Sequence, residues 1–461
     1  MKQSIHFIGI GGMGMGNLAS LMLAKGYRIS GSDIKENQLT QELKKNGARI
    51  YIGHRAANID NPDWAVYSSA IADNNPEILE IKSRSIPLKK RGELLAELVN
   101  AQDGITVAGA HGKTTTTSMI ANLLITAQLN PTTAIGGIVN GSAYHSRLGQ
   151  GKYFVAELDE SDGSFLFFKP FCSVITNIDF EHIDYYHNWE NILKSYKQFI
   201  QQTKPKGIIW ACGDDRRLTT ILKEEKKVYW AYGLTKQNDL CASDIIYNGY
   251  QSSFRCSFQK KDLGLFHLSV PGEHNILNAL GCIGVGIKLG IDLNVIQNSL
   301  KVYRGVERRF QVKARIRDIL VIEDYGHHPT EIQATLKTSR LLNKKRIIAV
   351  FQPHRYSRTK YLMDEFVESL ALCDHLILTD IYAASEKPLD NVNSQELYTR
   401  IKKKNTTPVE YFKKEAIAGH LISMSKSGDL IIFLGAGDIN KIGQDFVTLL
   451  TKSAGLASTQ H

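Results

Sequence analysis

The stretch Ile105-Thr-Val-Ala-Gly-Ala-His-Gly-Lys-Thr-Thr-Thr-Thr117 decides how the rest of this 461-residue chain is interpreted. A short run rich in β-branched residues leads into glycines, a lysine and a threonine, and a threonine-rich helix start follows. Glycines let backbone N–H groups surround a polyphosphate, the lysine supplies positive charge, and the threonine hydroxyl suits Mg²⁺. The general phosphate-loop pattern has an earlier glycine where Val107 stands, so this loop is shorter than the standard one. The order of strand, Gly-Lys-Thr and helix still favours an ATP site over a plain glycine turn.

The candidate ATP-binding residues of this loop follow one another without a gap. We expect Lys113 to contact the β- and γ-phosphates and Thr114 to contact magnesium. The whole set is Gly109, Ala110, His111, Gly112, Lys113, Thr114 and Thr115.

The composition is that of an ordinary globular protein, with 43% hydrophobic and 22% charged residues. The length predicts about two to four domains. No window reaches the roughly 18 uninterrupted apolar residues of a membrane helix, and the N-terminus runs straight into a strand without a leader. The six cysteines have neither CxxC nor metal-site spacing, which is typical of reduced thiols. We therefore expect a cytoplasmic protein with no membrane insertion.

The formal net charge of +10 does not by itself identify a partner. The basic residues are dispersed, and runs such as Lys402–Lys404 are typical of a solvated helix face. Anionic small-molecule substrates account for the excess as well as nucleic acid does, because each phosphate needs a positive environment. We expect small-molecule substrates and no nucleic acid.

Residues 1–98 predict a dinucleotide-type fold that begins with a strand over Ile5–Ile10. A glycine-rich loop and a helix from about Asn17 to Lys25 follow. A second strand, Arg28–Ser30, leads to Asp33, an acid about 20 residues after the loop that suits a ribose hydroxyl.

Residues 99–304 and 305–461 each alternate predicted strands with helices, which favours parallel sheets covered on both faces. Short polar-apolar stretches within residues 228–270 suggest an antiparallel insertion. The expected fold is α/β with three domains: a Rossmann-like N-terminal domain, a central phosphate-loop domain with a mostly parallel sheet, and a C-terminal Rossmann-like domain. The small, polar residues 454–461 predict a disordered end.

Acidic residues follow two predicted strands of the central block. Four acids lie within six residues from Glu157, directly after the strand Tyr153–Ala156, and His182 closes a second polar segment after the strand Ser173–Thr176. Hard cations take carboxylate oxygens, and open α/β sheets place ligands at strand ends. His182 could bind a second metal ion or a phosphate oxygen, whereas an acidic surface loop is the alternative for either segment alone. Together with the phosphate loop, these segments predict an ATP·Mg²⁺ centre.

Three polar residues near the start of an apolar helix suit the polar edge of an aromatic base. They are His274, Asn275 and Asn278, and helix capping by asparagine is the alternative. We therefore expect this helix start to contribute to the nucleotide site.

The last block carries two polar segments after successive predicted strands. Arg355 and Arg358 stand three apart and can grip one carboxylate, because guanidinium groups are planar forks. A solvated basic loop is the alternative. For the tandem histidines 327 and 328, hydrogen bonding to a substrate amine is favoured over zinc, since no cysteine lies nearby.

These segments together resemble the Mur ligase family of peptidoglycan synthesis, and within it the alanine-adding branch. The resemblance spans nearly the whole chain, and its last two motifs are those of that branch. The motifs are GIGGMGMG (9–16), AGAHGKTTTT (108–117), AELDESDGSF (156–165), TNID (176–179), GEHNILNAL (272–280), ERRFQ (307–311), DYGHHPTE (324–331) and FQPHRYSRT (351–359).

The resemblance implies a UDP-binding domain over residues 1–98, an ATPase domain over 99–304 and an amino-acid-binding domain over 305–461. It implies that ATP phosphorylates the lactyl carboxylate of UDP-N-acetylmuramate and that the amine of L-alanine attacks the acyl phosphate. Mg²⁺ would be the metal, and the protein would be a monomer or a homodimer. Most of the catalysis would come from positioning and from neutralising phosphoryl charge.

The resemblance also implies roles for individual residues. Lys113, Glu157, His182 and Arg309 would be catalytic, with Thr114, Glu157 and His182 as metal ligands. Asp324 and Tyr325 would join His274, Asn275 and Asn278 at the nucleotide, while His327, Arg355 and Arg358 would bind alanine. UDP would be held by Gly11, Gly12, Gly14, Asp33, His54, Ser68 and Ser69.

Some positions depart from the family pattern. Glu273 stands where a basic residue is usual, whereas Glu181 and Glu323 replace other acids and preserve the charge. Lys194 and Lys197 lie where many Mur ligases carry a carbamylated lysine, but the alanine-adding branch generally lacks that modification, and we do not expect it here.

Three other functions compete with alanine addition. A ligase that recycles a murein tripeptide is the nearest, although Arg355 and Arg358 argue against it. An inactive nucleotide-binding regulator would be expected to lack Lys113 or Glu157, and both are present. A dehydrogenase accounts for the first glycine loop but leaves the ATP centre unexplained.

Overall fold

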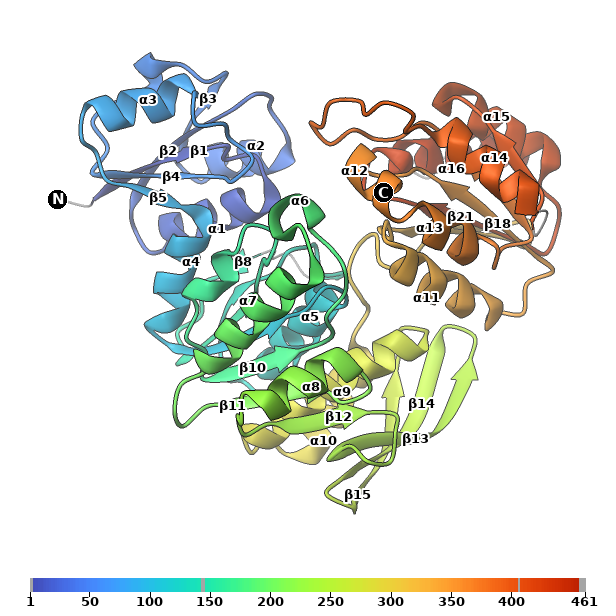
Figure 1. Cartoon of the computed structure of the whole chain (residues 1–461), viewed down its shortest axis with the longest axis horizontal. Coiled ribbons are helices and arrows are strands. Elements are labelled where there is room, and N and C mark those ends of the chain that lie inside the picture. Colours follow the sequence, from blue (N-terminus) through green and yellow to red (C-terminus); the bar gives the residue numbers. More distant parts are fainter. Residues whose placement is uncertain (1–2, 142–145, 405–406, 456–461) are drawn as a thin grey trace. The chain divides into compact units, whose positions relative to one another are not determined.

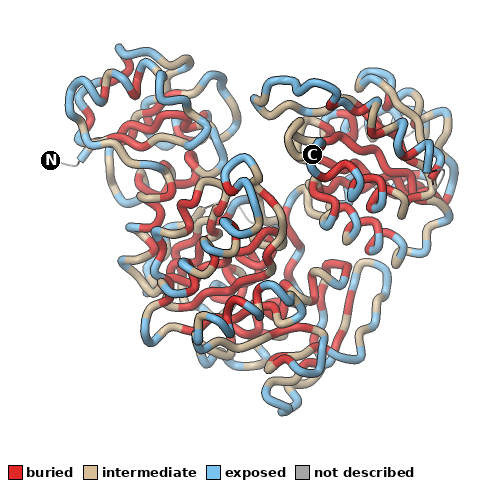
Figure 2. The backbone as a smooth tube through the Cα atoms, in the orientation of Figure 1, coloured by how far each residue is buried: buried red, intermediate tan, exposed pale blue. Residues whose placement is uncertain are grey.

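The computed structural model describes residues 3–141, 146–404 and 407–455, and its strands form three sheets (Figure 1). The strands near the middle of each sheet are almost continuously buried, whereas the edge strands and the outer faces of many helices are partly exposed (Figure 2). Each sheet is mostly parallel, which confirms the expected α/β class. Among the described helices, none combines the length and the apolar character that spanning a bilayer requires. Residues 456–461 of the predicted disordered end lie outside the described residues.

By its internal contacts the chain divides into two compact units. The first unit comprises Met1–Ser243, Arg255–Phe266 and Leu277–Arg304. The second unit comprises Asp244–Phe254, His267–Ile276 and Gly305–His461. The predicted boundaries at residues 98 and 304 remain predictions.

The N-terminal sheet has the order β3-β2-β1-β4-β5 and is parallel throughout. Ile8 pairs with Ser32 on one side and with Tyr67 on the other, so the strand ends that follow these residues share one edge of the sheet. The elements are β1 (Ser4–Ile8), α1 (Met13–Ala24), β2 (Arg28–Asp33), α2 (Gln38–Lys45), β3 (Arg49–Ile52), η1 (Ala56–Asn58), β4 (Trp64–Tyr67), α3 (Pro76–Ser83), β5 (Leu88–Lys90) and α4 (Arg91–Asn100).

Helix α1 begins about one turn earlier than predicted, at Met13 instead of Asn17. Gly12 is its N-cap, so Gly14 and Gly16 lie within the helix and not in the loop. A Cβ on Gly16 would overlap the side chain of Leu39 from α2. These glycines therefore serve close helix packing, which the sequence pattern does not distinguish from loop flexibility.

The central sheet has the order β15-β14-β13-β12-β11-β10-β6-β9-β7-β8. Val107 of β6 pairs with Glu157 of β9, and Ala108 of β6 pairs with Ile175 of β10. The loops that leave these three strands therefore start at the same edge of the sheet. The elements are β6 (Asp103–Ala108), α5 (Lys113–Thr126), β7 (Thr132–Ala134), β8 (Ser146–Arg147), β9 (Tyr153–Glu157), η2 (Ser164–Phe167), β10 (Cys172–Ile175), α6 (Ile183–Tyr186), α7 (Trp189–Gln201), β11 (Ile208–Cys212), α8 (Arg216–Glu224), β12 (Trp230–Gly233), β13 (Leu240–Asn248), β14 (Gln251–Phe258), β15 (Lys261–Leu268), α9 (Glu273–Lys288) and α10 (Leu293–Val302).

The prediction of an antiparallel insertion over residues 228–270 is wrong for the first strand of that range, β12. β12 pairs parallel with β11 and with the start of β13, because helix α8 provides a crossover connection between β11 and β12. β13, β14 and β15 are neighbours in the sheet and are joined by two-residue connections, as in hairpins.

The C-terminal sheet has the order β16-β17-β21-β18-β19-β20, with β16 as its antiparallel edge. Asp324 and Phe351 both pair with Leu434, so β17, β18 and β21 end side by side. The elements are β16 (Gln311–Ile316), β17 (Ile319–Asp324), α11 (Pro329–Arg340), β18 (Arg346–Phe351), α12 (Tyr356–Tyr361), α13 (Met363–Leu370), β19 (His375–Leu378), α14 (Ser394–Lys404), β20 (Val409–Tyr411), α15 (Lys414–Met424), β21 (Asp429–Leu434) and α16 (Ile439–Ser453).

Two helices, α12 and α13, follow strand β18. Leu362 separates them, since its φ of −115° leaves the helical range. Arg355 is the N-cap of α12 with a φ of +69°, a conformation that side chains other than glycine rarely adopt. The strain therefore lies at one of the predicted alanine-binding residues.

The core of the central domain contains a close contact between helix α9 and strand β11. Trp210 is fully buried, and Gly284 of α9 lies against its indole ring. A Cβ on Gly284 would stand 2.5 Å from the ring, which is closer than side-chain carbons pack. The helix can therefore approach the sheet only because residue 284 has no side chain.

We expect Gly284→Ala to lower the free energy of unfolding by about 1–3 kcal/mol, because overpacking forces the ring or the helix to move. Gly419→Ala is the matched control, since Gly419 also lies inside a helix but nothing stands within 4 Å of its added Cβ. The control should gain stability by up to about 1 kcal/mol from helix propensity. Denaturant unfolding of both variants measures the difference, and equal effects would contradict the packing argument.

Candidate active site

The loop after β6 has the backbone geometry of an anion-binding turn. Gly109 and Gly112 have φ values of +130° and +80°, which glycine adopts without strain. A Cβ on Gly112 would stand 2.5 Å from Asn278 Oδ1. Helix α5 starts at Lys113, and Gly112 offers no side-chain cap, so the positive end of the helix dipole opens into the loop.

The segment after β10 holds this loop in place. Asn177 Oδ1 accepts a hydrogen bond from the backbone N–H of His111 at 2.9 Å, and Asn177 Nδ2 donates to the His111 carbonyl at 3.1 Å. Thr176 Oγ1 donates to the same carbonyl at 2.6 Å. Asp179 Oδ2 lies 2.9 Å from His111 Nε2. The TNID motif therefore positions the phosphate loop, which its sequence did not indicate.

The ammonium group of Lys113 is surrounded by hydrogen-bond acceptors. Nζ lies 2.7 Å from Glu160 Oε1 and donates to the carbonyls of Gly109 and Ala110 at 2.6 and 3.0 Å. Burial alone would lower the pKa of Lys113, but the carboxylates of Glu160 and Glu181 outweigh it and raise the pKa above its ordinary value. Lys113 is therefore a permanent cation beside the loop.

Thr114 and Glu157 lie together, as predicted for two ligands of one metal ion. Thr114 Oγ1 donates to Glu157 Oε1 at 2.8 Å, and the backbone N–H of Gly136 donates to Oε2 at 2.8 Å. A hydroxyl and a carboxylate at this spacing are donors that Mg²⁺ accepts. Their alignment follows from the pairing of Val107 with Glu157.

A second group of possible metal ligands contains Glu160, Glu181 and His182. One donor atom from each lies within 4.8 Å of the other two. His182 Nε2 is 3.4 Å from Glu160 Oε1 and 3.8 Å from Glu181 Oε2. Burial tends to lower the pKa of His182, yet the Glu160 and Glu181 carboxylates raise it overall. Mutual repulsion of two buried carboxylates favours a cation here.

Glu160 was not selected as a site residue from the sequence, although it contacts both Lys113 and His182. It lies within the acidic run after β9, which was the available signal.

The residues of helix α9 that were predicted to contact the base divide between the units. Asn278 accepts from Thr116 Oγ1 at 3.1 Å in the first unit, whereas His274 and Asn275 belong to the second. Asn275 lies within α9, and its Nδ2 donates to the Pro271 carbonyl at 2.6 Å, which is a local backbone contact but not N-capping by a side-chain oxygen.

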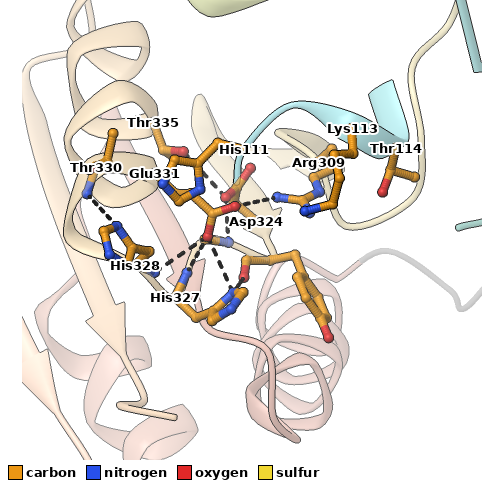
Figure 3. Close-up of polar contacts among 12 residues, drawn as sticks. His111, Lys113, Thr114, Arg309, Asp324, His327, His328, Thr330, Glu331 and Thr335 are labelled. Atoms are coloured by element: carbon orange, nitrogen blue, oxygen red, sulfur yellow. Dashed lines mark hydrogen bonds and ion pairs between the residues drawn. The ribbon is translucent and has the colours of Figure 1, made fainter. Parts of the chain in front are cut away.

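The second unit contains a charged network centred on Glu331 of α11 (Figure 3). Glu331 Oε1 lies 3.1 Å from Arg309 Nη1, and Oε2 accepts from the backbone N–H groups of His327 and His328 at 3.1 and 3.3 Å. The guanidinium of Arg309 also lies over the ring of Tyr325, 5.2 Å from its centroid. Glu331 is quoted in the DYGHHPTE motif, but the sequence did not reveal that it organises this network.

Two other residues of the second unit show strong effects of burial. Asp324 accepts from the backbone N–H groups of Phe310 and Gly326, each at 2.7 Å, and burial raises its pKa. Burial, together with the charge of Arg309, lowers the pKa of His274 to about 4. His274 is therefore neutral at physiological pH.

The predicted alanine-binding residues gather around His354, which sequence reasoning missed. Arg358 Nη1 lies 3.1 Å from His354 Nδ1, the rings of His327 and His354 are 5.5 Å apart, and Tyr382 stacks on His354 at 5.6 Å. Arg355 Nη1 lies 3.7 Å from Glu386 Oε1. Burial first, and then the neighbouring cations, lower the pKa of His354 to about 3. Neutral His354 thus accepts from Arg358 and leaves the positive charge to the arginines.

The predicted UDP-binding residues lie at the end of β2 and after β1, β3 and β4. The backbone N–H of Gly11 donates to Asp33 Oδ2 at 2.8 Å, and an added Cβ on Gly11 would stand 2.8 Å from the same oxygen. Ser68 Oγ accepts from the backbone N–H of Ala70 at 3.3 Å, and Ser69 is exposed. The remaining members are Gly12 and Gly14, which open α1, and His54, whose ring is largely buried beside Ser32.

Gly109→Ala tests whether the loop geometry creates the nucleotide site. An added Cβ would overlap Thr176 Oγ1, so we expect nucleotide affinity to fall by about tenfold or more, which corresponds to about 1.4 kcal/mol, while the fold persists. Gly47→Ala is the control, because Gly47 also has a positive φ, of +100°, but nothing stands within 4 Å of its Cβ. Calorimetric titration with nucleotide and thermal unfolding separate the two effects. Unchanged affinity in Gly109→Ala would refute the assignment.

Comparison with known proteins gives one consistent family. The models "Mur ligase family, catalytic domain", "Mur ligase middle domain" and "Mur ligase, glutamate ligase domain" match residues 4–103, 107–286 and 308–437. The UDP-N-acetylmuramate–L-alanine ligase of Geotalea uraniireducens is 45% identical over 449 residues, which cover 97% of this chain and 98% of that protein.

Solved structures agree with this assignment and with three α/β domains. The crystal structure of a UDP-N-acetylmuramate-alanine ligase from Thermotoga maritima matches with a TM-score of 0.83 and 28% identity, over 98% of this chain and 99% of that one. A murein peptide ligase from Psychrobacter arcticus matches with a TM-score of 0.72 and 26% identity, over 99% of this chain and 100% of that one. On all of these grounds, the chain belongs to the Mur ligase family.

Proposed function

We propose that this protein joins L-alanine to the lactyl carboxylate of UDP-N-acetylmuramate, with ATP hydrolysed to ADP and phosphate, as a step of peptidoglycan precursor synthesis. The observation that carries the proposal is the 45% identity, over nearly the full length of both chains, to a ligase named for this reaction. The phosphate loop with Lys113, and the adjacent Thr114–Glu157 pair, supply the ATP chemistry that the reaction needs. Substrate binding by the individual residues is part of the proposal.

The reaction proceeds in two displacements. A carboxylate oxygen of the substrate attacks the γ-phosphorus of ATP, the bond to the β–γ bridging oxygen breaks, and ADP leaves. The amine of alanine, after losing a proton, attacks the acyl carbon, and the tetrahedral intermediate expels phosphate. Lys113 neutralises charge on the transferring phosphoryl group, and the N-terminus of α5 orients it, so positioning and electrostatics provide most of the rate enhancement.

Magnesium is proposed as the metal because the available donors are oxygen-rich. Thr114 and Glu157 would hold one ion, and Glu160, Glu181 and His182 would hold a second. A divalent ion bound there would screen negative charge on the phosphates and on the incoming carboxylate. In the second unit, Arg355 and Arg358 would clamp the carboxylate of alanine, and His327 would hydrogen-bond to its amine.

The recycling of a murein peptide is the second candidate, because a ligase of that kind shares the fold over the full chain. We prefer ligation of alanine over recycling of a peptide for two reasons. The sequence identity to alanine ligases is higher, and two arginines follow strand β18. The cytoplasmic location and the choice between monomer and homodimer remain predictions.

The test is phosphate release from the purified protein with Mg²⁺-ATP and UDP-N-acetylmuramate, with single amino acids compared against a tripeptide. Release that requires L-alanine supports the proposal, and removal of Mg²⁺ by a chelator should abolish it. Release with the tripeptide alone would assign the protein to the recycling branch. Glycine and serine should be poorer acceptors by about 1–3 kcal/mol, because they differ from alanine by one small group.

Lys113→Ala should abolish alanine-dependent phosphate release while UDP-N-acetylmuramate still binds, because the variant lacks the ammonium group that contacts the loop carbonyls of Gly109 and Ala110. Lys197→Ala is the control, since Lys197 pairs with Glu224 on helix α8 and belongs to no proposed site. Turnover assays and substrate calorimetry on both variants distinguish the outcomes. Retained turnover in Lys113→Ala would reject its role at the phosphates.

Arg355→Ala should raise the KM for alanine much more than the KM for ATP, because it removes one arm of the carboxylate clamp. The loss of such a charged partner costs about 2–5 kcal/mol. Arg340→Ala, which removes an arginine paired with Asp374 elsewhere in the same unit, is the control. Steady-state kinetics with each substrate varied in turn provides the measurement, and equal effects on both KM values would count against the clamp.

A further inference from the structure

A buried carboxylate lies beneath the predicted UDP-binding edge of the N-terminal sheet. Glu77 lies in the first turn of helix α3, where Asn75 is the N-cap and accepts from the Glu77 N–H at 2.9 Å. The residue is 0% exposed. A charge is expensive to bury, and such groups persist where several partners satisfy them.

The partners of Glu77 come from three separate segments: strand β1, strand β2 and the stretch from His54 to Asn58 after β3. Ser32 Oγ donates to Oε2 at 2.5 Å, and Asn58 Nδ2 donates to Oε1 at 2.5 Å. His54 Nδ1 lies 3.3 Å from Oε2, and the buried His6 places Nε2 at 3.6 Å from the same oxygen. Burial would raise the pKa of Glu77, but hydrogen bonds from these partners lower it to about 2. Glu77 is therefore a carboxylate at physiological pH and can only accept hydrogen bonds.

The hydrogen-bond directions around Ser32 fix the proton on His54. The hydroxyl of Ser32 has one proton, and it donates that proton to Glu77. Ser32 Oγ also lies 2.9 Å from His54 Nδ1, so in that contact the hydroxyl must accept. Nδ1 of His54 therefore carries a proton, and the direct contact with Glu77 Oε2 requires the same arrangement.

When His54 is neutral, its other ring nitrogen is available as an acceptor. In neutral histidine only one nitrogen is protonated, so a proton on Nδ1 leaves a lone pair on Nε2. Among the described residues Nε2 has no hydrogen-bond partner, and the side chain keeps 12% exposure. This is the arrangement of a histidine oriented through one nitrogen to bind a ligand through the other.

The same segment is connected to the glycine loop. The backbone carbonyl of Ser32 accepts from the N–H groups of Gly9 and Ile10, at 2.9 and 3.0 Å. The next residue, Asp33, bonds to Gly11. The hydroxyl of Ser32 thus contacts Glu77 and His54, while its backbone holds the start of the loop predicted to bind UDP.

We propose that Glu77 is a positioning residue for UDP binding: with Ser32 it holds His54 in the tautomer protonated on Nδ1, so that Nε2 accepts a hydrogen bond from a hydroxyl or imide N–H of the uridine. The choice of UDP-N-acetylmuramate as ligand rests on the proposed function. The proton on Nδ1 does not, because it follows from contacts within this chain.

The first experiment uses the wild-type protein with ¹⁵N-labelled histidine. We expect the His54 resonances, assigned by comparison with His54→Gln, to show an unprotonated Nε2 at neutral pH. Addition of UDP, or of UDP-N-acetylmuramate, should shift the Nε2 resonance as it accepts a hydrogen bond. A proton on Nε2, or no response to either compound, would overturn the proposal.

The second experiment compares Glu77→Gln with Glu80→Gln on the same helix. Glutamine can donate toward Nδ1, so Glu77→Gln should move the proton of His54 to Nε2 and raise the KM for UDP-N-acetylmuramate by about tenfold, as the loss of one hydrogen bond predicts. The kcat and the KM values for ATP and alanine should change little. Glu80, which pairs with Arg84, is the control and should leave all of these values unchanged.

A Glu77→Gln protein with an exchanged tautomer and an unchanged KM for UDP-N-acetylmuramate would refute the functional part of the proposal. The wild-type spectra need no variant, so they test it even if Glu77→Gln is too unstable to purify. A wild-type protein that releases no phosphate with alanine would contradict the proposed function instead, and the response of His54 to UDP would still decide the present proposal.

Discussion

The parallel alignment of β6 with β9 and β10 is the constraint on which the catalytic region depends. Because Val107 pairs with Glu157 and Ala108 pairs with Ile175, three chain segments leave the sheet at one level. The phosphate loop, the acidic run and the TNID segment therefore meet without any long connection. A shift of one residue in this register would turn Glu157 to the other face of the sheet and separate it from Thr114.

Buried or largely buried carboxylates organise each predicted substrate region by a common principle. Glu160 pairs with Lys113, Glu331 with Arg309, and Glu77 with Ser32 and His54. In each case the acid holds a cation or a donor in one orientation, which limits the reorganisation required when a ligand binds. Removal of any one acid would leave its partners incompletely paired, so these acids contribute to stability as well as to geometry.

The sequence predicted most of the fold and the grouping of Thr114 with Glu157 because both depend on local signals. Strand ends, the Gly-Lys-Thr order and the acidic run can each be recognised in a short stretch of sequence. The structure brings Thr114 and Glu157 together as expected. Glu77, Glu160, Glu331 and His354 were missed because their roles depend on partners distant in sequence or on burial. Lys113 and Glu160 are 47 positions apart, and Ser32 and Glu77 are 45 apart, so only the folded chain shows which acid meets which donor. The start of α1 was misplaced because glycine serves helix packing and loop flexibility alike.

The ion pair between Lys113 and Glu160 also has a consequence for the order of events at the loop. An incoming polyphosphate and Glu160 compete for the same ammonium group, and both are negatively charged. A cation placed among Glu160, Glu181 and His182 would weaken the ion pair between Glu160 and Lys113. The ammonium group would then be available to the polyphosphate. With nucleotide and metal bound at the proposed positions, their affinities at this loop would be thermodynamically linked, and each would strengthen the other to the same extent.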